Sequence, residues 1–539
     1  MRTYHKPSHR TFKSIIMEKK ILSFLFLLTY CSFLTAQSYF NKNFTFAQIN
    51  GINQNIFQNI CVSHDTIVAY GSIRLPSTSY KQGVLLTMFD SSGNLLKQKN
   101  IMFPDSNSIA LDDGYGIIKT SDGGYALVAA SYPKLNTVFI KVNYDLEVEI
   151  IKEFEDDTVR RQLGYSKIIG LPNGYVFFGT TVYYEGINFG EGDGAAMRVD
   201  LQGNVLWRKS YGYAGANERF ESGFSFNDST FVFAGSYRWS YDWFHQKRII
   251  YVIDGNGNEK KAWTESENSA AVISQILPNP TRDGYITFND VFKGLFTGVA
   301  NGNDKIAHTF TELDSNFQTK WTTPVATNLY DGEKFLAFYQ TKSGNYIGAG
   351  GRSKFTAEVG NSDSNGWFFS ISPTGDSLWA NIIKGGTSFA YSNHVFNGIG
   401  ELSSGNIILS GAISEFGANP LNSYAGEKCW LVKIGKDGCA DELCSVNADK
   451  ILTLSPPERL KIYPNPASDE LTIELLPNLQ SGRLTLRLCN QLGQTVHSQA
   501  WREESPTQTI SVASLPSGFY VVSVTNGAET WYQKVIIQR

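Results

Sequence analysis

The residues best suited to contact a ligand form an aromatic cluster in the middle of the chain. The cluster consists of Tyr237, Trp239, Tyr241, Trp243 and Phe244, with Arg238 and Asp242 beside them. Aromatic rings with polar edges stack on sugars and anchor protein interfaces. We therefore predict a glycan- or protein-binding loop. The alternative is that these rings only cover a small core of their own loop.

Side chains for acid–base or nucleophilic catalysis form no familiar motif. The chain has neither a Gly-x-Ser-x-Gly nucleophile elbow nor a phosphate-binding loop ending in Gly-Lys-Ser/Thr. Acidic runs such as Glu155–Asp157 lie between predicted strands, where solvated loop charge is the simpler interpretation. His308 and His394 lie in or near strands, as structural histidines do. The sequence predicts a non-catalytic protein without a cofactor or metal. The alternative is a secreted hydrolase or lyase.

Composition restricts the fold and the partners. The 539 residues carry 47 basic and 50 acidic side chains, a net charge of −3, which excludes a strongly basic nucleic-acid binder as the default. Aromatic residues make up 13% of the chain and charged residues only 18%, and there are 49 glycines. This composition is typical of sheets joined by tight turns. We expect an all-β protein that does not bind nucleic acid.

The N-terminus has the pattern of a secretory signal peptide. Two lysines precede an apolar run over Ile21–Leu34, and cleavage is expected between Ala36 and Gln37. The apolar run is shorter than the about 20 residues that a transmembrane helix needs. No later segment has 18 uninterrupted apolar residues, so the mature chain is predicted to lack a membrane span. Translation is expected to begin at Met17, and residues 1–36 would engage the signal-peptide export machinery and be removed.

Export makes disulfides possible. Cys439 and Cys444 lie close together in the segment GCADELC and could close a small loop, or they could be two small residues in a linker. Cys61, Cys429 and Cys489 lie in apolar strands and are expected in the core. The sequence contains no Cys-x-x-Cys pair for a zinc site.

Two landmarks repeat seven times along the chain. The first is a turn followed by an apolar strand, as in SDGGYALVAAS at Ser121. The second is an apolar strand, a polar turn and another strand, and its turns begin about 57 residues apart at Asp90, Asn143, Asp200, Asp254, Asp314, Ser372 and Gly435. Each repeat predicts four strands, with Asp-Gly and Asn-Gly supplying the positive φ angles of two-residue hairpins. Such units must stack to bury both faces, which predicts a seven-bladed β-propeller over residues 37–436.

The seventh repeat lacks a fourth strand after its second turn. The mature N-terminus, Tyr39–Phe46, has the same character as Leu206–Tyr211, which is a predicted fourth strand. We infer that residues 39–46 complete blade seven and remove an open sheet edge. The pattern DGGY, LVAAS and VFIKV resembles the secreted propellers of Bacteroidetes-type bacteria.

The last part of the chain is a separate unit. Residues 437–457 read as a linker, and residues 458–539 alternate short strands with Gly and Pro turns, which predicts a small β-sandwich. An ordered motif runs through the sandwich: Tyr463, Pro464, Asn465, Pro466, Asp469, Gly493, Gly518, Tyr520 and Lys534. This set resembles the type A C-terminal sorting domain of the type IX secretion system. The resemblance implies recognition in the periplasm by the type IX machinery, removal of the domain, and a secreted or outer-surface location.

Overall fold

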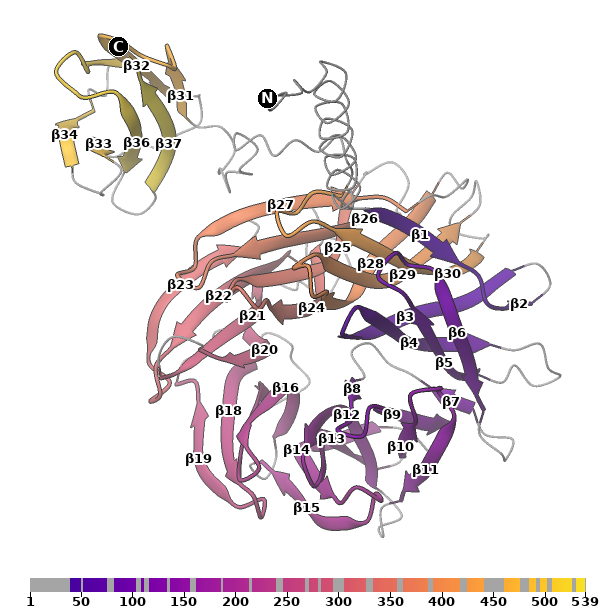
Figure 1. Cartoon of the computed structure of the whole chain (residues 1–539). Coiled ribbons are helices and arrows are strands. Elements are labelled where there is room, and N and C mark those ends of the chain that lie inside the picture. The colour runs from indigo at the N-terminus through magenta and orange to yellow at the C-terminus, as the bar shows by residue number, and fades with distance from the viewer. Residues whose placement is uncertain are drawn as a thin grey trace, which may run out of the picture.

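Seven units of antiparallel strands stand side by side around a ring, which makes a β-propeller of seven blades (Figure 1). Short parallel pairings of β26 with β28 and of β30 with β3 join blades 6, 7 and 1 into one continuous sheet. The computed structural model describes residues 39–49, 52–74, 82–102, 108–110, 116–132, 136–155, 161–185, 188–212, 216–238, 246–266, 271–279, 283–293, 305–325, 333–355, 362–385, 391–416, 424–440, 460–475, 484–490, 495–501, 507–525 and 530–538. The predicted fold class is confirmed for both parts of the chain.

Each blade runs from a first strand at the centre of the ring to a fourth strand at its rim. Blade 1 consists of β3 (Ile52–Ser63), β4 (Thr66–Arg74), β5 (Gln82–Phe89) and β6 (Leu95–Ile101), with β2 (Gln48–Ile49) paired to β3. Blade 2 consists of β7 (Ser108–Ala110) and β8 (Ile117–Lys119), then β9 (Tyr125–Tyr132), β10 (Thr137–Val142) and β11 (Val148–Phe154). Blade 3 consists of β12 (Arg161–Leu171), β13 (Gly174–Glu185), β14 (Asn188–Val199) and β15 (Val205–Tyr211).

The remaining blades follow the same order. Blade 4 consists of β16 (Asn217–Asn227), β17 (Thr230–Arg238), β18 (Gln246–Asp254) and β19 (Glu259–Thr264). Blade 5 consists of β20 (Ala271–Pro278), β21 (Tyr285–Lys293), β22 (Lys305–Leu313) and β23 (Thr319–Val325). Blade 6 consists of β24 (Glu333–Gln340), β25 (Tyr346–Phe355), β26 (Ser362–Ile371) and β27 (Ser377–Ile383). Blade 7 consists of β28 (Tyr391–Glu401), β29 (Ile407–Phe416), β30 (Tyr424–Ile434) and, from the N-terminus, β1 (Phe40–Phe44).

The seven second turns, which recur about 57 residues apart, share one backbone geometry. In each, the first residue accepts a hydrogen bond from the N–H of the fourth and donates its own N–H to the carbonyl of the fifth. The fourth residue has a positive φ, and it is Leu146 or Phe317 in two blades and glycine in the other five. These turns are therefore longer than the two-residue hairpins that the sequence predicted, because their one positive φ falls at a bulge beside the next strand.

A side chain caps this turn in the first six blades. In blade 4, Asp254 Oδ1 accepts hydrogen bonds of 2.8 Å from the N–H groups of both Asn256 and Asn258. The residue that begins the turn does the same in the other five: Asp90, Asn143, Asp200, Asp314 and Ser372. The repeated polar residue is thus required by local backbone geometry.

Neighbouring blades are joined at these turns. In blade 3, the Trp207 indole lies over Gly257 of the next turn and donates 2.8 Å to Gly255 O, and Lys209 Nζ donates 2.6 Å to Asn258 Oδ1. A large side chain and a lysine two residues later on a fourth strand therefore fasten one blade to the turn of the next. The tryptophans of the repeat serve packing between blades.

The same contact closes the ring. Strand β1 pairs with β30 in antiparallel register, with Phe40 opposite Lys433 and Phe44 opposite Cys429. Phe40 lies against Gly93 in the blade 1 turn, and Lys42 Nζ donates to Ser92 O at 2.8 Å and Gly93 O at 3.0 Å. Phe40 and Lys42 thus take the places of Trp207 and Lys209, and the predicted closure by residues 39–46 is confirmed.

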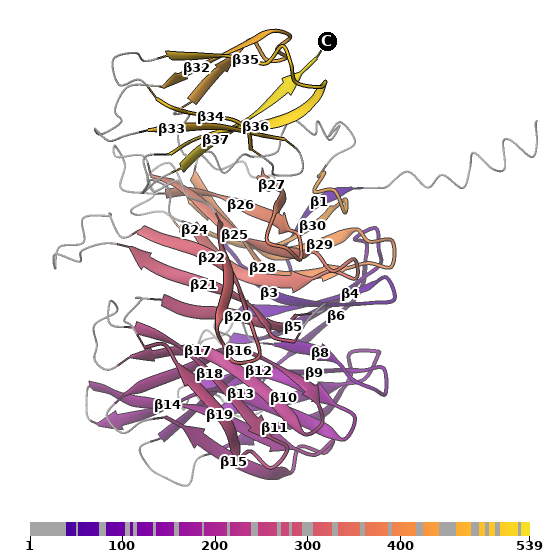
Figure 2. The same ribbon diagram turned by 90° about the vertical axis from the view of Figure 1, so that its left-hand side faces the viewer.

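The C-terminal unit is a sandwich of two sheets, seen face to face in Figure 2. One sheet contains β31 (Leu460–Tyr463), β32 (Glu470–Leu475) and β35 (Thr507–Ser511). The other contains β33 (Thr485–Asn490), β34 (Thr495–Ala500), β36 (Gly518–Thr525) and β37 (Thr530–Ile537). Leu471, Ile473, Leu486, Val522 and Val535 form the centre of its own core, each with 0% exposure.

Replacing the closing strand tests the seam. Deleting residues 39–46 leaves β30 with an unpaired edge and removes Phe40 and Lys42 from the blade 1 turn, so the melting temperature should fall by several degrees or the protein should aggregate. A matched control places the five residues of Trp207–Tyr211 where Phe40–Phe44 stand, which restores the aromatic and the lysine in register. Calorimetry should show near-native melting for this control. A deletion variant as stable and monomeric as the parent would contradict the closure.

Acid should loosen the turns only at a pH below the range in which ordinary carboxyls are protonated. The Lys141 ammonium and the Thr120 hydroxyl hold the pKa of Asp122 at about 2, and the backbone N–H groups of Asn258 and Gln318 hold the pKa values of Asp254 and Asp314 below 3.8. A depressed folded-state pKa gives stability that is present above about pH 4 and is lost as pH falls toward about 2. Urea unfolding should show that the free energy of unfolding falls as the pH is lowered across this range. The fall with pH should be shallower in Asp122→Asn, and an equally steep fall in this variant would contradict the prediction.

Candidate functional site

The aromatic cluster begins at the end of a hairpin in blade 4. The pairing of β17 with β18 continues to Arg238 opposite Gln246. Tyr237 lies in β17, is half-buried and packs against the core between blades 3 and 4. It therefore supports the base of the loop. Trp239, Tyr241, Trp243 and Phe244 lie outside the described residues.

A serine, an aspartate and a histidine meet in blade 5. Asp290 on β21 accepts a hydrogen bond from the Ser274 hydroxyl on β20 and is 2.7 Å from Nδ1 of His308 on β22. A catalytic triad needs the histidine between the nucleophile and the carboxylate, because the imidazole must take the serine proton. Here the carboxylate is in the middle, and His308 is only 2% exposed. This group ties three strands together and cannot activate Ser274.

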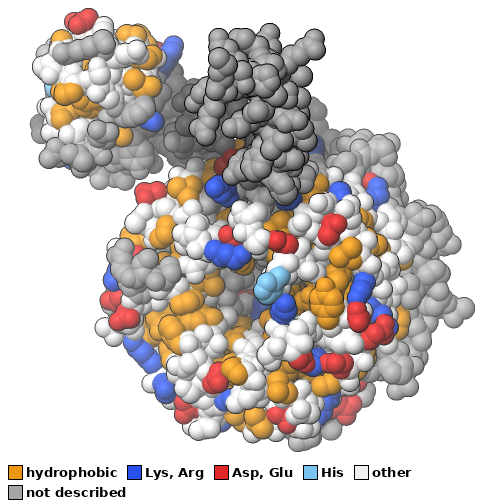
Figure 3. All heavy atoms as spheres, in the orientation of Figure 1, with side chains coloured by type: hydrophobic (Ala, Val, Ile, Leu, Met, Phe, Trp, Pro, Cys, Tyr) orange, Lys and Arg blue, Asp and Glu red, His pale blue; other side chains and the backbone are white. Residues whose placement is uncertain are grey.

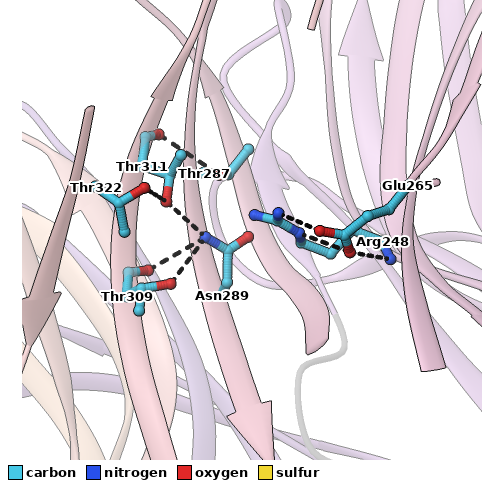
Figure 4. Close-up of polar contacts among 7 residues, drawn as sticks. All are labelled: Arg248, Glu265, Thr287, Asn289, Thr309, Thr311 and Thr322. Atoms are coloured by element: carbon cyan, nitrogen blue, oxygen red, sulfur yellow. Dashed lines mark hydrogen bonds and ion pairs between the residues drawn. The ribbon is translucent and has the colours of Figure 1, made fainter. Parts of the chain in front are cut away.

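A ladder of polar side chains lies beside it within the same sheet (Figure 4). Asn289 Nδ2 donates to Thr309 Oγ1 and Thr311 Oγ1, both at 3.2 Å, and Thr311 is 3.1 Å from Thr322 across the sheet. Asn289 has no exposed surface. These groups satisfy one another across adjacent strands, which is the ordinary way to keep polar side chains inside a sheet.

Figure 4 also draws an ion pair of the preceding blade. Arg248 binds Glu265 with two hydrogen bonds, Nε to Oε2 at 3.2 Å and Nη2 to Oε1 at 2.5 Å. Figure 4 shows the other end of the guanidinium lying on the side to which the Asn289 amide oxygen projects. That oxygen is buried and has no hydrogen-bond partner among the described residues.

A pair of carboxylates lies between blades 3 and 4. A Cβ on Gly212 would come within 2.6 Å of Glu218 Oε2 and 3.1 Å of Asp193 Oδ1, so the two carboxylates converge on one point. Glu218 has no exposed surface, whereas Asp193 is half-buried. Two carboxylates in different environments are the usual catalytic groups of glycoside hydrolases. No motif in the sequence indicated this pair, because its members are 25 residues apart on separate blades.

A second feature without a sequence signal is a pocket of about 290 Å³ between blades 2 and 3. Lys119, Thr120 and Ser121 form one side of it, and Pro172 and Tyr175 form the other. Its residues come from the first turns of two repeats, where the sequence pattern indicated only hairpins. The pocket could therefore not be predicted from the repeat pattern.

The cysteines divide as the strand pattern indicated. Cys61 and Cys429 are free, and burial raises the pKa of Cys61 to about 11. Cys439 is 2% exposed and disulfide-bonded, while its predicted partner Cys444 lies outside the described residues. Among the described residues, no three His, Cys, Asp or Glu side chains gather as a metal site.

The face of the ring seen in Figure 3 carries basic and acidic side chains intermixed with apolar ones. This face shows no broad basic stripe of the kind that binds nucleic acid. No helix among the described residues is long and apolar enough to span a membrane. The predicted cleavage residues Ala36 and Gln37 lie outside the described residues.

The sorting motif is fastened to the last strand of the sandwich. Asn465 accepts a 2.9 Å hydrogen bond from Ile536 N through its Oδ1 and donates to Lys534 O at 3.2 Å through its Nδ2. Ala467 adds backbone bonds to Ile536 and Gln538 on the same strand. The segment Tyr463–Pro466 is exposed, so it is held in place on the surface of the domain.

The other motif residues serve the sandwich itself. The carbonyl of Asp469 accepts a 2.8 Å bond from Val512 N, and Tyr520, which is 6% exposed, donates its hydroxyl to Pro516 O at 2.9 Å. Gly518 begins β36, and Gly493 lies outside the described residues. Of the described motif residues, Asn465 is thus the one whose side chain bonds to β37.

Solved structures similar to this chain share its architecture at low identity. A puromycin hydrolase is 9% identical over 79% of this chain and 60% of its own, with a TM-score of 0.44. Polysaccharide lyase Uly1 is 11% identical over 73% of this chain and 94% of its own, with a TM-score of 0.39. The β-propeller domain of the Trilobed protease from Pyrococcus furiosus is 9% identical over 67% and 92%, with a TM-score of 0.35. The likenesses concern the fold alone.

No curated protein matched the chain. Residues 461–538 match the family described as the secretion system C-terminal sorting domain. The match covers the sandwich with its fastened motif and confirms the resemblance drawn from the sequence. The chain is therefore a β-propeller protein that carries a type IX sorting domain and is exported to the cell surface or beyond it.

Proposed function

We propose that the exported propeller is a non-catalytic binding module for a glycan or protein outside the cell. The observation that carries this proposal is the state of the ionisable side chains in the described part of the ring. The histidine with a carboxylate partner, His308, is buried, and its partner Asp290 separates it from Ser274. The Arg248 guanidinium is bound by the Glu265 carboxylate of the same blade. These groups stabilise seams and sheets.

The aromatic loop of blade 4 supports the same proposal. Tyr237 packs against the core between blades 3 and 4, and the two strands that flank the loop stay paired to Arg238 and Gln246. Rigid strands on both sides of a binding segment lower the entropy cost of binding. Ligand binding by the remaining aromatic residues would then depend on the ring as a scaffold.

A hydrolase or lyase is the second candidate, and the convergence of Asp193 and Glu218 is what favours it. A buried carboxyl beside a partly exposed carboxylate could divide the roles of acid and base. Glu218 has no exposed surface, which argues for a structural role in the seam.

A glycan array with the mature chain tests the binding proposal. The double change Trp239→Ala and Trp243→Ala should abolish retention on the glycan that the array identifies, since stacking surface is lost. The melting temperature should stay within about one or two degrees, because surface changes cost little stability. Intact binding with a large loss of stability would contradict the proposal. Release of cleaved products by the parent but not by Glu218→Gln would establish the enzyme instead.

Removing residues 460–539 tests whether the C-terminal domain directs export to the cell surface. The sandwich has its own core and the ring closes without it, so the truncated chain should fold and remain in the periplasm. Cell fractionation and surface proteolysis would locate it. The reciprocal fusion of residues 458–539 to a periplasmic reporter should reach the surface in a host with the type IX system. Surface display of the truncated chain at normal levels would be the contrary outcome.

A further inference from the structure

The first turn of blade 1 departs from the repeat. This turn joins the first two strands of a blade, and in blade 1 it contains His64 and Asp65, between β3 and β4. His64 has a φ of 47° and Asp65 a φ of 63°. In five other blades a glycine takes the positive φ of the first turn: Gly123, Gly174, Gly284, Gly344 and Gly405. Glycine adopts such angles without steric penalty, so blade 1 keeps two side chains where the repeat favours none.

The Asp65 side chain is explained by the closure of the ring. Its Oδ1 accepts a 2.7 Å hydrogen bond from Ser403 N in the first turn of blade 7, and its Oδ2 accepts one from the Ser403 hydroxyl. These hydrogen bonds lower the pKa of Asp65, and the charges of Lys342 and Lys433 lower it further. Among the described residues, His64 forms no hydrogen bond to another blade. Ring closure therefore accounts for Asp65 and leaves His64 unexplained.

His64 stands at the end of a chain of hydrogen bonds that begins in blade 2. Strand β8 and the end of β3 lie side by side near the centre of the ring (Figure 1). Lys119 Nζ, at the end of β8, donates to Ser63 Oγ at 2.8 Å, and Ser63 Oγ is 3.0 Å from His64 Nδ1. An ammonium can only donate, and the serine hydroxyl polarised by it is a good donor to Nδ1. This assignment places the imidazole proton on Nε2.

The two ends of this chain are donors without an acceptor in the fold. Lys119 and His64 are both exposed. Lys119 forms no ion pair with a described carboxylate, and its one hydrogen bond leaves two N–H groups for another acceptor. Lys141 differs, because its ammonium is bound by both Asp122 and Glu149. An ammonium and an imidazole N–H held in one group favour an anionic oxygen ligand.

We propose that Lys119 and His64 bind one anionic oxygen group of the ligand, such as a carboxylate or a sulfate. The Lys119 ammonium would donate charge-assisted hydrogen bonds to it, and His64 Nε2–H would donate to a second oxygen of the same group. Ser63 is a positioning residue, because it bonds both side chains and sets the imidazole tautomer. This inference rests on the proposed binding function and gives it a second contact, separate from the blade 4 loop.

Calorimetric titration of the full mature chain tests the site with four probes of similar length: an oligogalacturonate, a sulfated dextran oligosaccharide, an oligoglutamate and an uncharged dextran oligosaccharide. At least one anionic probe should bind, and the tightest identifies the anionic group and its source. The uncharged probe should show no binding that depends on Lys119. Lys119→Met and His64→Gly should each weaken anion binding about tenfold, as expected for a lost hydrogen bond to a charged group. The control Lys260→Met, at an exposed lysine of β19, should bind like the parent.

Glycine substitutions at the two residues of the turn separate binding from ring closure. His64→Gly should melt within about one or two degrees of the parent, because glycine accepts the positive φ and no hydrogen bond between blades is lost. Asp65→Gly should melt several degrees lower, because the hydrogen bonds to Ser403 are lost. It should bind the anionic probe as tightly as the parent or more tightly, because a negative charge beside the site is removed.

The contrary outcomes are distinct. Anionic binding that is unchanged in both Lys119→Met and His64→Gly would overturn the site. Weaker binding in His64→Gly together with melting several degrees lower would assign the histidine a structural role instead. Failure of every anionic probe, with retention that depends on Trp239 and Trp243 intact, would overturn this site and leave the proposed function standing. Absence of all glycan and protein retention would overturn both.

Discussion

The structure depends on one interaction, the packing of fourth-strand side chains on the second turn of the next blade. In blade 3, Trp207 covers the turn glycine and Lys209 donates to an oxygen of that turn; in blade 6, Trp379 and Asn381 make the corresponding contacts. The contact runs in one direction around the ring, so each blade completes its neighbour and no blade is stable alone. Seven such contacts need seven fourth strands, and the chain leaves the last blade with three. Phe40 and Lys42 supply the missing contact from the other end of the chain.

The repeat made this part of the fold predictable from the sequence. A capped turn needs Asp, Asn or Ser at its first position and a positive φ at its fourth; the first requirement is met in the first six blades and the second in all seven. The closure was predictable for the same reason, because FNKNF carries the aromatic and the lysine at the spacing of Trp207 and Lys209. The length of the turn was not predictable from the sequence. A glycine that follows Asp or Asn is compatible with a two-residue hairpin as well as with the longer turn that is observed.

The candidate sites were not predictable, and the reason is geometric. Glu218 and Asp193 converge only because the twist of two blades brings a first strand beside a third strand. Lys119 and Tyr175 line one pocket from separate repeats, each in a segment that reads as an ordinary turn. The sorting motif is the opposite case. Its residues are ordered along the sequence, and the contacts of Asn465 with Lys534 and Ile536 show why the first motif must be accompanied by the last strand.

Repetition also indicates where function can lie in this ring. A residue that recurs at one register position in several blades is explained by packing, as the tyrosines opposite the second turn are. Lysines show the contrast between two positions of one blade: Lys141 is bound by Asp122 and Glu149, whereas Lys119 donates to the Ser63 hydroxyl of blade 1. Departures from the repeat are therefore the positions at which function, and not packing between blades, can determine the residue.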